Sequence, residues 1–237
     1  MPHRTRHRGP DPRDERLFSG AALFSLREAV ADYSWLLSRG YSEAAGEAIV
    51  GDRYRLPQRV RIAMRRMACS DDALRRRKEH RIRTFEPGAE LLIDGFNVLI
   101  TLESALGGAV VLEGRDGCLR DLAGLRGSYR AVDETRPALE AAGRVLAQAG
   151  NPHATWIFDR PVSNSGRVAA IVRDVAAANG LNCDADVADA ADALLAGATA
   201  VIATADSSIL DRTGHWFNLA RTVVEREVPE AWIVSPA

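Results

Sequence analysis

Apolar and polar residues follow two different patterns along this 237-residue chain, and the change falls near residue 87. Before it, apolar residues recur every three or four positions, which is the spacing of one helix face. After it, short apolar runs alternate with helical segments, as in a parallel sheet whose strands are joined by helices. We therefore predict an α/β fold, a three-layer sandwich with a mainly parallel sheet, preceded by a small all-α domain.

The amino-terminal part divides into an arm and a series of helices. Residues 1–16 are polar, rich in Arg, His and Pro, and without apolar periodicity, so a disordered basic arm is expected. Residues 17–86 form the predicted helical domain, and the expected helices cover 17–39, 42–50, 57–69 and 71–83. Glu86-Pro87-Gly88 cannot continue a helix, so the α/β domain is expected to begin at residue 87 and run to 237.

Short apolar runs in the second part each close on an aspartate. The runs 91–93, 154–158, 181–183 and 200–205 are followed by Asp94, Asp159, Asp184 and Asp206. Asp94-Gly95 is also a common hairpin turn, but a hairpin would not explain four runs that end alike. The carboxyl ends of parallel strands meet at one edge, where open α/β sheets bind ligands. We expect the aspartates to gather there.

The remaining elements are expected between and after these strands. The predicted helices cover 134–149, 165–178, 187–196 and 217–227, and a last edge strand covers 232–234. The apolar run after Gly107-Gly108 predicts a short strand or hairpin arm. The glycine-rich stretch 115–130 predicts an ordered insertion. Trp216 and Trp232 are expected in the core or at a domain seam.

Composition narrows the class of protein. Hydrophobic residues make up 46% and charged residues 27% of the chain, which is ordinary for a soluble globular protein. No apolar run approaches the roughly 20 residues of a membrane-spanning helix, and the start lacks the apolar region of a secretory signal. Three widely spaced cysteines suit reduced thiols. We expect a cytoplasmic protein without a membrane partner.

Charge is distributed unevenly. Residues 1–90 carry 19 Lys and Arg against 13 Asp and Glu, whereas residues 91–237 carry 12 against 19. Between Arg53 and Arg83 there are 12 basic and 3 acidic residues. This density favours either phosphate contacts or pairing with the acidic domain across a seam. Arg59, Arg65 and Arg66 of the third helix are our candidate substrate contacts, and their short helices weakly resemble a helix-turn-helix.

Aspartates gathered at a sheet edge repel one another unless a cation is present. Mg²⁺ or Mn²⁺ prefers oxygen ligands and can activate a water for phosphoryl chemistry. Zinc is disfavoured because the five histidines show no paired spacing. Asp189 and Asp192 share one helix face, so one of them can reach the edge. Any single aspartate could instead be a helix N-cap or a turn residue, the role we expect of Asp184 and Asp211. Whether Asp184, Asp186, Asp189 or Asp211 joins the site stays open.

The order of these motifs resembles a known family. Ile93-Asp94-Gly95-Phe96-Asn97, Phe158-Asp159, Asp192-Ala193-Leu194-Leu195 and Thr204-Ala205-Asp206 are similar to the PIN-like nuclease superfamily, especially its NYN branch, over residues 91–234. The resemblance implies an enzyme that hydrolyses RNA phosphodiesters, with Mg²⁺ or Mn²⁺ held by Asp94, Asp159, Asp192 and Asp206, and with Asn97 orienting or contacting substrate. The amino-terminal half is similar to a small helical domain of an uncharacterised prokaryotic family. The insertion 103–130 and Asp159 depart from the commoner PIN layout.

A loop before the helix 165–178 adds candidate substrate contacts, namely Arg160, Ser163, Asn164 and Arg167. Helix amino termini attract phosphate, although a plain capped turn explains the same residues. The sequence thus predicts a metal-dependent ribonuclease whose helical domain holds RNA, with DNA a less favoured partner and a homodimer left open. Two alternatives stay: an RNA-binding module with a degenerate acidic site, and a helix-turn-helix-like DNA-binding regulator.

Overall fold

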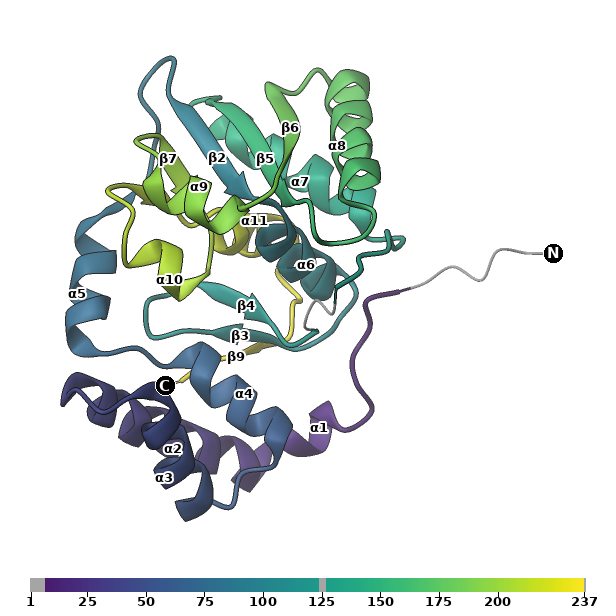
Figure 1. The fold of residues 1–237 in the computed structure, drawn as a ribbon. Coiled ribbons are helices and arrows are strands. Elements are labelled where there is room, and N and C mark those ends of the chain that lie inside the picture. Colours follow the sequence, from purple (N-terminus) through teal and green to yellow (C-terminus); the bar gives the residue numbers. More distant parts are fainter. Residues whose placement is uncertain (1–6, 124–126, 237) are drawn as a thin grey trace.

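A six-stranded parallel sheet forms the centre of the computed structural model, which describes residues 7–123 and 127–236. The strand order is β1-β8-β7-β2-β5-β6 (Figure 1). The strands are β1 (Arg81–Ile82), β2 (Glu90–Asp94), β5 (His153–Asp159), β6 (Cys183–Ala188), β7 (Val201–Ala203) and β8 (Trp216–Phe217). No described helix is both long and apolar enough to cross a membrane.

Helices cover both faces of this sheet. One face carries α6 (Gly95–Leu106), α7 (Thr135–Gln148), α8 (Ser165–Asn179) and α11 (Leu219–Glu227), and the other carries α9 (Ala191–Gly197) and α10 (Ser207–Leu210). Successive strand residues explain this, because their side chains point to opposite faces. Leu91 and Ile93 join the larger core cluster, whereas Leu92 packs on the cluster that contains Ile202. The predicted α/β architecture is confirmed.

A helical region precedes the sheet, as predicted. Its helices are α1 (Asp14–Leu17), α2 (Gly20–Ser38), α3 (Glu43–Arg53), α4 (Gln58–Met67) and α5 (Asp71–Glu79). The side chains of Ser42 and Ser70 accept hydrogen bonds from the backbone of Ala45 and Ala73, so each caps the helix that follows.

A small second sheet lies between the helices α2–α4 and the large sheet (Figure 1). It consists of β4 (Leu119–Asp121), β3 (Val111–Glu113) and β9 (Ile233–Val234). Leu112 and Val234 pack with the helical core, while Val111 and Leu119 pack with the core of the large sheet. Trp232 also packs on the helical core and Trp216 is fully buried, so both lie where they were expected. The two parts of the chain therefore bury apolar surface against one sheet.

Several predicted boundaries were wrong. The hairpin at Asp94-Gly95, which the sequence disfavoured, is indeed absent because Gly95 begins α6. The helix expected over 71–83 ends at Glu79, and β1 follows, so residues before the predicted boundary at 87 join the large sheet. The strand expected over 181–183 covers 183–188 instead, the helix expected over 187–196 begins at Ala191, and the expected insertion contains β4.

The amino-terminal arm was expected to be disordered, but its described residues, 7–16, are held in place by the rest of the protein. Residues 1–6 lie outside the described range. The Arg8 side chain pairs with buried Glu103 at 2.8 Å. Asp14 begins α1, is fully buried and pairs with Arg59 at 2.6 Å. These ion pairs fix the arm to both parts of the protein.

Candidate active site

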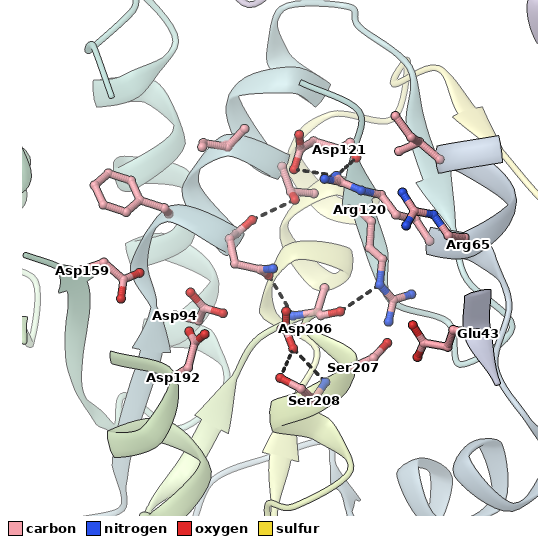
Figure 2. A pocket seen from close by; sticks show the side chains of 17 residues that line it. Glu43, Arg65, Asp94, Arg120, Asp121, Asp159, Asp192, Asp206, Ser207 and Ser208 are labelled. Carbon is pink, nitrogen blue, oxygen red and sulfur yellow. Dashed lines mark hydrogen bonds and ion pairs between the residues drawn. The ribbon is translucent and has the colours of Figure 1, made fainter. Parts of the chain in front are cut away.

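The acidic residues expected at the sheet edge come together there. Asp94 and Asp159 end the adjacent strands β2 and β5, Asp206 follows β7 on the other side of β2, and Asp192 lies in the first turn of α9. The helix after β2 covers one face of the sheet and the helix after β7 covers the other, which opens a crevice between the strand ends. All four aspartates line this cleft, whose volume is about 670 Å³ (Figure 2).

The backbone at Gly95 lies close against the Phe158 ring, and this contact positions Asp94. A methyl group on Gly95 would lie 2.5 Å from the Phe158 ring and 2.7 Å from the Ile157 carbonyl oxygen. Only glycine therefore allows α6 to begin so close to β5. This places Asp94 at the strand end, in the N-cap position of α6, without a side-chain bond to that helix.

The Asp94 carboxyl is buried and destabilised as an anion. Asp94 is 8% exposed, and this burial is the largest cause that raises the pKa of its carboxyl to about 7. The Thr204 hydroxyl donates a hydrogen bond of 2.7 Å, which opposes the rise, but the charges of Asp206, Asp192 and Asp159 add to it. Burial also raises the pKa of Asp192, and Asp159 and Asp206 raise it further. The cleft therefore favours binding of a positive charge.

Asp206 also stabilises the start of a helix. Its Oδ1 accepts hydrogen bonds from the Ser208 amide at 2.7 Å, the Ser208 hydroxyl at 2.6 Å and the Ile209 amide at 3.4 Å. The carboxylate thus caps α10. The cap holds the side chain in one orientation at the edge of the cleft.

The backbone of Ala205, the residue before Asp206, is held at both of its polar groups. Its amide donates to Asn97 Oδ1 at 2.8 Å, and its carbonyl accepts from Arg120 Nε at 2.8 Å. Asn97, expected to orient or contact substrate, lines the cleft and makes this structural contact. Asn97 and Arg120 together fix the loop that carries Asp206.

Arg120 belongs to a buried ion-pair network that sequence reasoning missed. Two of its nitrogens donate to Asp116 at 3.0 and 2.7 Å, and Arg77 Nη1 donates to the same carboxylate at 2.7 Å. Burial alone would raise the pKa of Asp116, but Arg120 and Arg77 hold it well below its ordinary value. Arg77, only 2% exposed, also pairs with Asp211 at 2.8 Å. The network links α5 to the acidic site.

The helical region supplies the opposite wall of the cleft. Arg65 and Arg66 of α4 line it together with Glu43, and Figure 2 shows Arg65 and Glu43 across from the aspartates. Arg65 lies 3.4 Å from Glu47, and Arg66 lies 3.4 Å from the Asp121 carboxylate. These pairs are partly exposed and leave the arginines at the cleft surface.

Other expected substrate contacts lie elsewhere. Arg59 is outside the cleft lining and pairs with Asp14. Arg160 pairs with Asp189 at 2.6 Å, and neither lines the cleft. Asn164 and Arg167 line a separate pocket of about 460 Å³. Ser163 pairs through its backbone with Gly127 and Tyr129.

The remaining aspartates considered in advance also lie outside the cleft lining. Asp184 pairs with Arg173 at 2.8 Å, and Asp211 pairs with Arg77. Asp211 lies in the turn after α10, as expected, whereas Asp184 lies within β6 and neither caps a helix nor forms a turn. Asp186 lies within β6, where its Oδ1 accepts a hydrogen bond from the Val187 amide.

The donors of the cleft suit a hard cation that keeps water ligands. Within residues 7–123 and 127–236, no three Asp, Glu, His or Cys side chains form a group that could by itself hold a metal ion. Mg²⁺ does not need one, because it is commonly held by one or two carboxylates together with waters and phosphate oxygens. Among the described residues, the lining contains no histidine or cysteine, the usual ligands of zinc. Carboxylate oxygens are the kind of ligand that Mg²⁺ or Mn²⁺ takes.

Comparison with known proteins places the chain in a family. Residues 86–222 match a family described as a domain of unknown function, DUF5616. The chain belongs to this family. Residues 25–80 match a second family, described as a protein of unknown function, DUF434. A protein of Methanocaldococcus jannaschii, "Uncharacterized protein MJ0935", is 29% identical over 196 residues, which cover 78% of this chain and 89% of its own. No solved structure matches.

Proposed function

We propose that this member of the DUF5616 family is a metal-dependent ribonuclease of the PIN-like superfamily, similar to its NYN branch. The observation that carries the proposal is the meeting of Asp94, Asp159, Asp192 and Asp206, from four separate elements, in one cleft at the carboxyl edge of a parallel sheet. This edge is where open α/β sheets bind ligands.

Asp94, Asp159, Asp192 and Asp206 would hold Mg²⁺ or Mn²⁺. When bound, such a cation supplies an activated water and neutralises the charge that develops on a phosphoryl group. With a pKa of about 7, Asp94 carries a proton in part of the molecules at neutral pH and must release it to serve as a ligand. The Thr204 hydroxyl, which donates to Oδ2, keeps the carboxylate oriented as this proton leaves.

The opposite wall would provide affinity for the RNA backbone. Four carboxylates repel a polyanion, so the arginines must compensate. Arg65 and Arg66, which line the cleft, would contact phosphates of the RNA backbone, a sequence-independent role. Asn97 uses Oδ1 to hold the Ala205 amide and can direct its amide nitrogen to the substrate. We propose RNA rather than DNA as the partner, in the cytoplasm.

The packing of α4 argues against a DNA-binding regulator. A recognition helix must expose one long face to the major groove. In α4, Val60, Met64 and Met67 are buried in the core, and Arg59 is held by Asp14. Arg61 pairs with Asp52, and Arg65 and Arg66 line the acidic cleft. An RNA-binding module that does not cut stays as the second candidate, because the same cleft and wall would serve it.

Cleavage of single-stranded RNA tests the proposal. We expect the purified protein to cut RNA with Mn²⁺ and not with EDTA, and Asp94→Asn and Asp206→Asn to stop cleavage while remaining folded. Asp184→Asn is the matched control, since Asp184 is exposed and pairs with Arg173 outside the cleft. Manganese calorimetry then separates the two candidates. The enzyme is supported if the wild type binds manganese and cleaves RNA and Asp94→Asn does neither. The RNA-binding module is supported if the wild type binds RNA but neither binds manganese nor cleaves.

A further inference from the structure

A second pocket, of about 480 Å³, opens beside β1 at the edge of the large sheet. Among the described residues, it shares no lining residue with the acidic cleft. Its charged lining consists of four arginines and two glutamates: Arg81, Arg83, Arg221, Arg226, Glu113 and Glu225. Its chemistry is thus the opposite of that of the acidic cleft.

Arg81 has hydrogen-bonding capacity that the protein leaves unused. Its Nε is buried and has no hydrogen-bond partner among the described residues. Its guanidinium lies 5.7 Å from the centre of the Trp216 ring, which holds it in place by a cation–π contact. The two terminal nitrogens of Arg81 also have no hydrogen-bond partner among the described residues, but they are not buried, so an acceptor in the pocket can reach them.

The other arginines differ in how far they are neutralised. Arg221 pairs with Glu113 and with Glu225. Arg226 donates to the Gln148 side chain at 3.0 Å, which leaves its charge in place. Arg83 is exposed and, within the described part of the chain, has no carboxylate partner. Positive charge therefore exceeds negative charge around the pocket.

We propose that this pocket binds a phosphate-bearing ligand of mononucleotide size. Guanidinium groups present N–H donors in a planar fork that matches two phosphate oxygens. The volume exceeds that of a phosphate group and lies in the range of small-molecule sites. Ile82, Ala149 and Phe217 supply apolar wall for the organic part. The inference does not rest on hydrolysis at the acidic cleft.

Calorimetry with adenosine 5′-monophosphate in EDTA tests this site directly. We expect one molecule to bind per chain at low salt, and Arg81→Gln or Arg83→Gln to weaken binding about tenfold or more, because each removes charge-assisted hydrogen bonds. Arg136→Gln is the control: Arg136 is an exposed arginine of α7, about 18 Å along that helix from Gln148. Adenosine without phosphate should give no heat.

Two outcomes would overturn the site. One is absence of binding of adenosine 5′-monophosphate and of inorganic phosphate to the wild-type chain. The other is binding that Arg83→Gln, in an exposed position that tolerates substitution, leaves unchanged. Terminal nucleotides of RNA carry the same chemistry, so a 5′-phosphorylated and a 5′-hydroxyl oligonucleotide are compared in Asp94→Asn protein. A preference for the 5′-phosphate that Arg83→Gln removes identifies an RNA end as the ligand; no preference identifies the free nucleotide.

Discussion

Replacing Asp94 by Asn should stabilise the protein in the absence of metal, and by an amount that depends on pH. The pKa of Asp94 rises from 3.8 to about 7 on folding, mainly because the carboxyl is buried. A raised pKa means that the folded state binds more protons than the unfolded state. The contribution of Asp94 to stability therefore falls as pH rises from about 4 to 7 and is constant above that. Asn is nearly isosteric, uncharged, and can still accept the hydrogen bond from Thr204.

The size of the effect follows from the pKa difference. Each pKa unit corresponds to about 1.4 kcal/mol, so the ionised Asp94 costs the folded state about 4 kcal/mol at pH 8. At pH 5 the cost is about 1.5 kcal/mol, because the unfolded carboxyl is already ionised while the folded one is protonated. The stabilisation by Asp94→Asn should thus grow by about 3 kcal/mol between pH 5 and pH 8.

Urea unfolding in EDTA at the two pH values measures this difference. Comparing variant with wild type at each pH cancels the titration of groups that do not interact with Asp94. Mn²⁺ at a hundred times its dissociation constant should add about 2.7 kcal/mol to the wild type and leave the variant unchanged. A stability difference that is the same at pH 5 and pH 8 would refute the reasoning, since Asp94 would then be ionised in the folded state at both.

The other predictions concern the walls and supports of the cleft. Charge reversal of Arg65 and Arg66 should weaken binding of all RNA sequences and flatten the plot of log K against log salt, and equal slopes before and after reversal would contradict this. Arg59→Glu should instead mainly lower the melting temperature, because it leaves buried Asp14 unpaired. Gly95→Ala should lower the free energy of unfolding, measured with urea, by about 1–3 kcal/mol, because the new methyl group collides with Phe158. Gly166→Ala should be tolerated, because a methyl group there meets no atom within 4 Å. Arg120→Met should lower the free energy of unfolding by about 1–3 kcal/mol, because the Ala205 carbonyl loses its donor while Asp116 keeps Arg77 as a partner. Arg75→Met, whose pair with Asp72 is exposed, should lower it little. Similar melting temperatures for these two variants would count against the network.

The strand ends of the acidic site were predictable because central parallel strands are buried on both faces. Such strands read as short apolar runs, and an aspartate at the end of one is conspicuous. The edge strand β6 does not read this way, since Asp184 and Asp186 alternate along it and are exposed. Its length and start were therefore misjudged. The helix α6 was missed for the opposite reason: almost all of it is buried between layers, so it lacks a polar face.

The supports of the site could not be predicted, because their partners are distant in the sequence. Arg77 stands in a run of basic residues that looks like a solvated helix face, yet its partners Asp116 and Asp211 are 39 and 134 positions away. The small sheet joins strands of two or three residues, one of them at the end of the chain. Neither arrangement leaves a local periodic signal.

The most direct test of the central claim is a crystal grown or soaked in Mn²⁺ and examined for anomalous scattering. The account predicts a peak in the acidic cleft, between Asp94 and Asp206, that is absent from crystals of Asp94→Asn treated in the same way. A cleft without an anomalous peak in the wild type, or a peak that persists unchanged in Asp94→Asn, would contradict it.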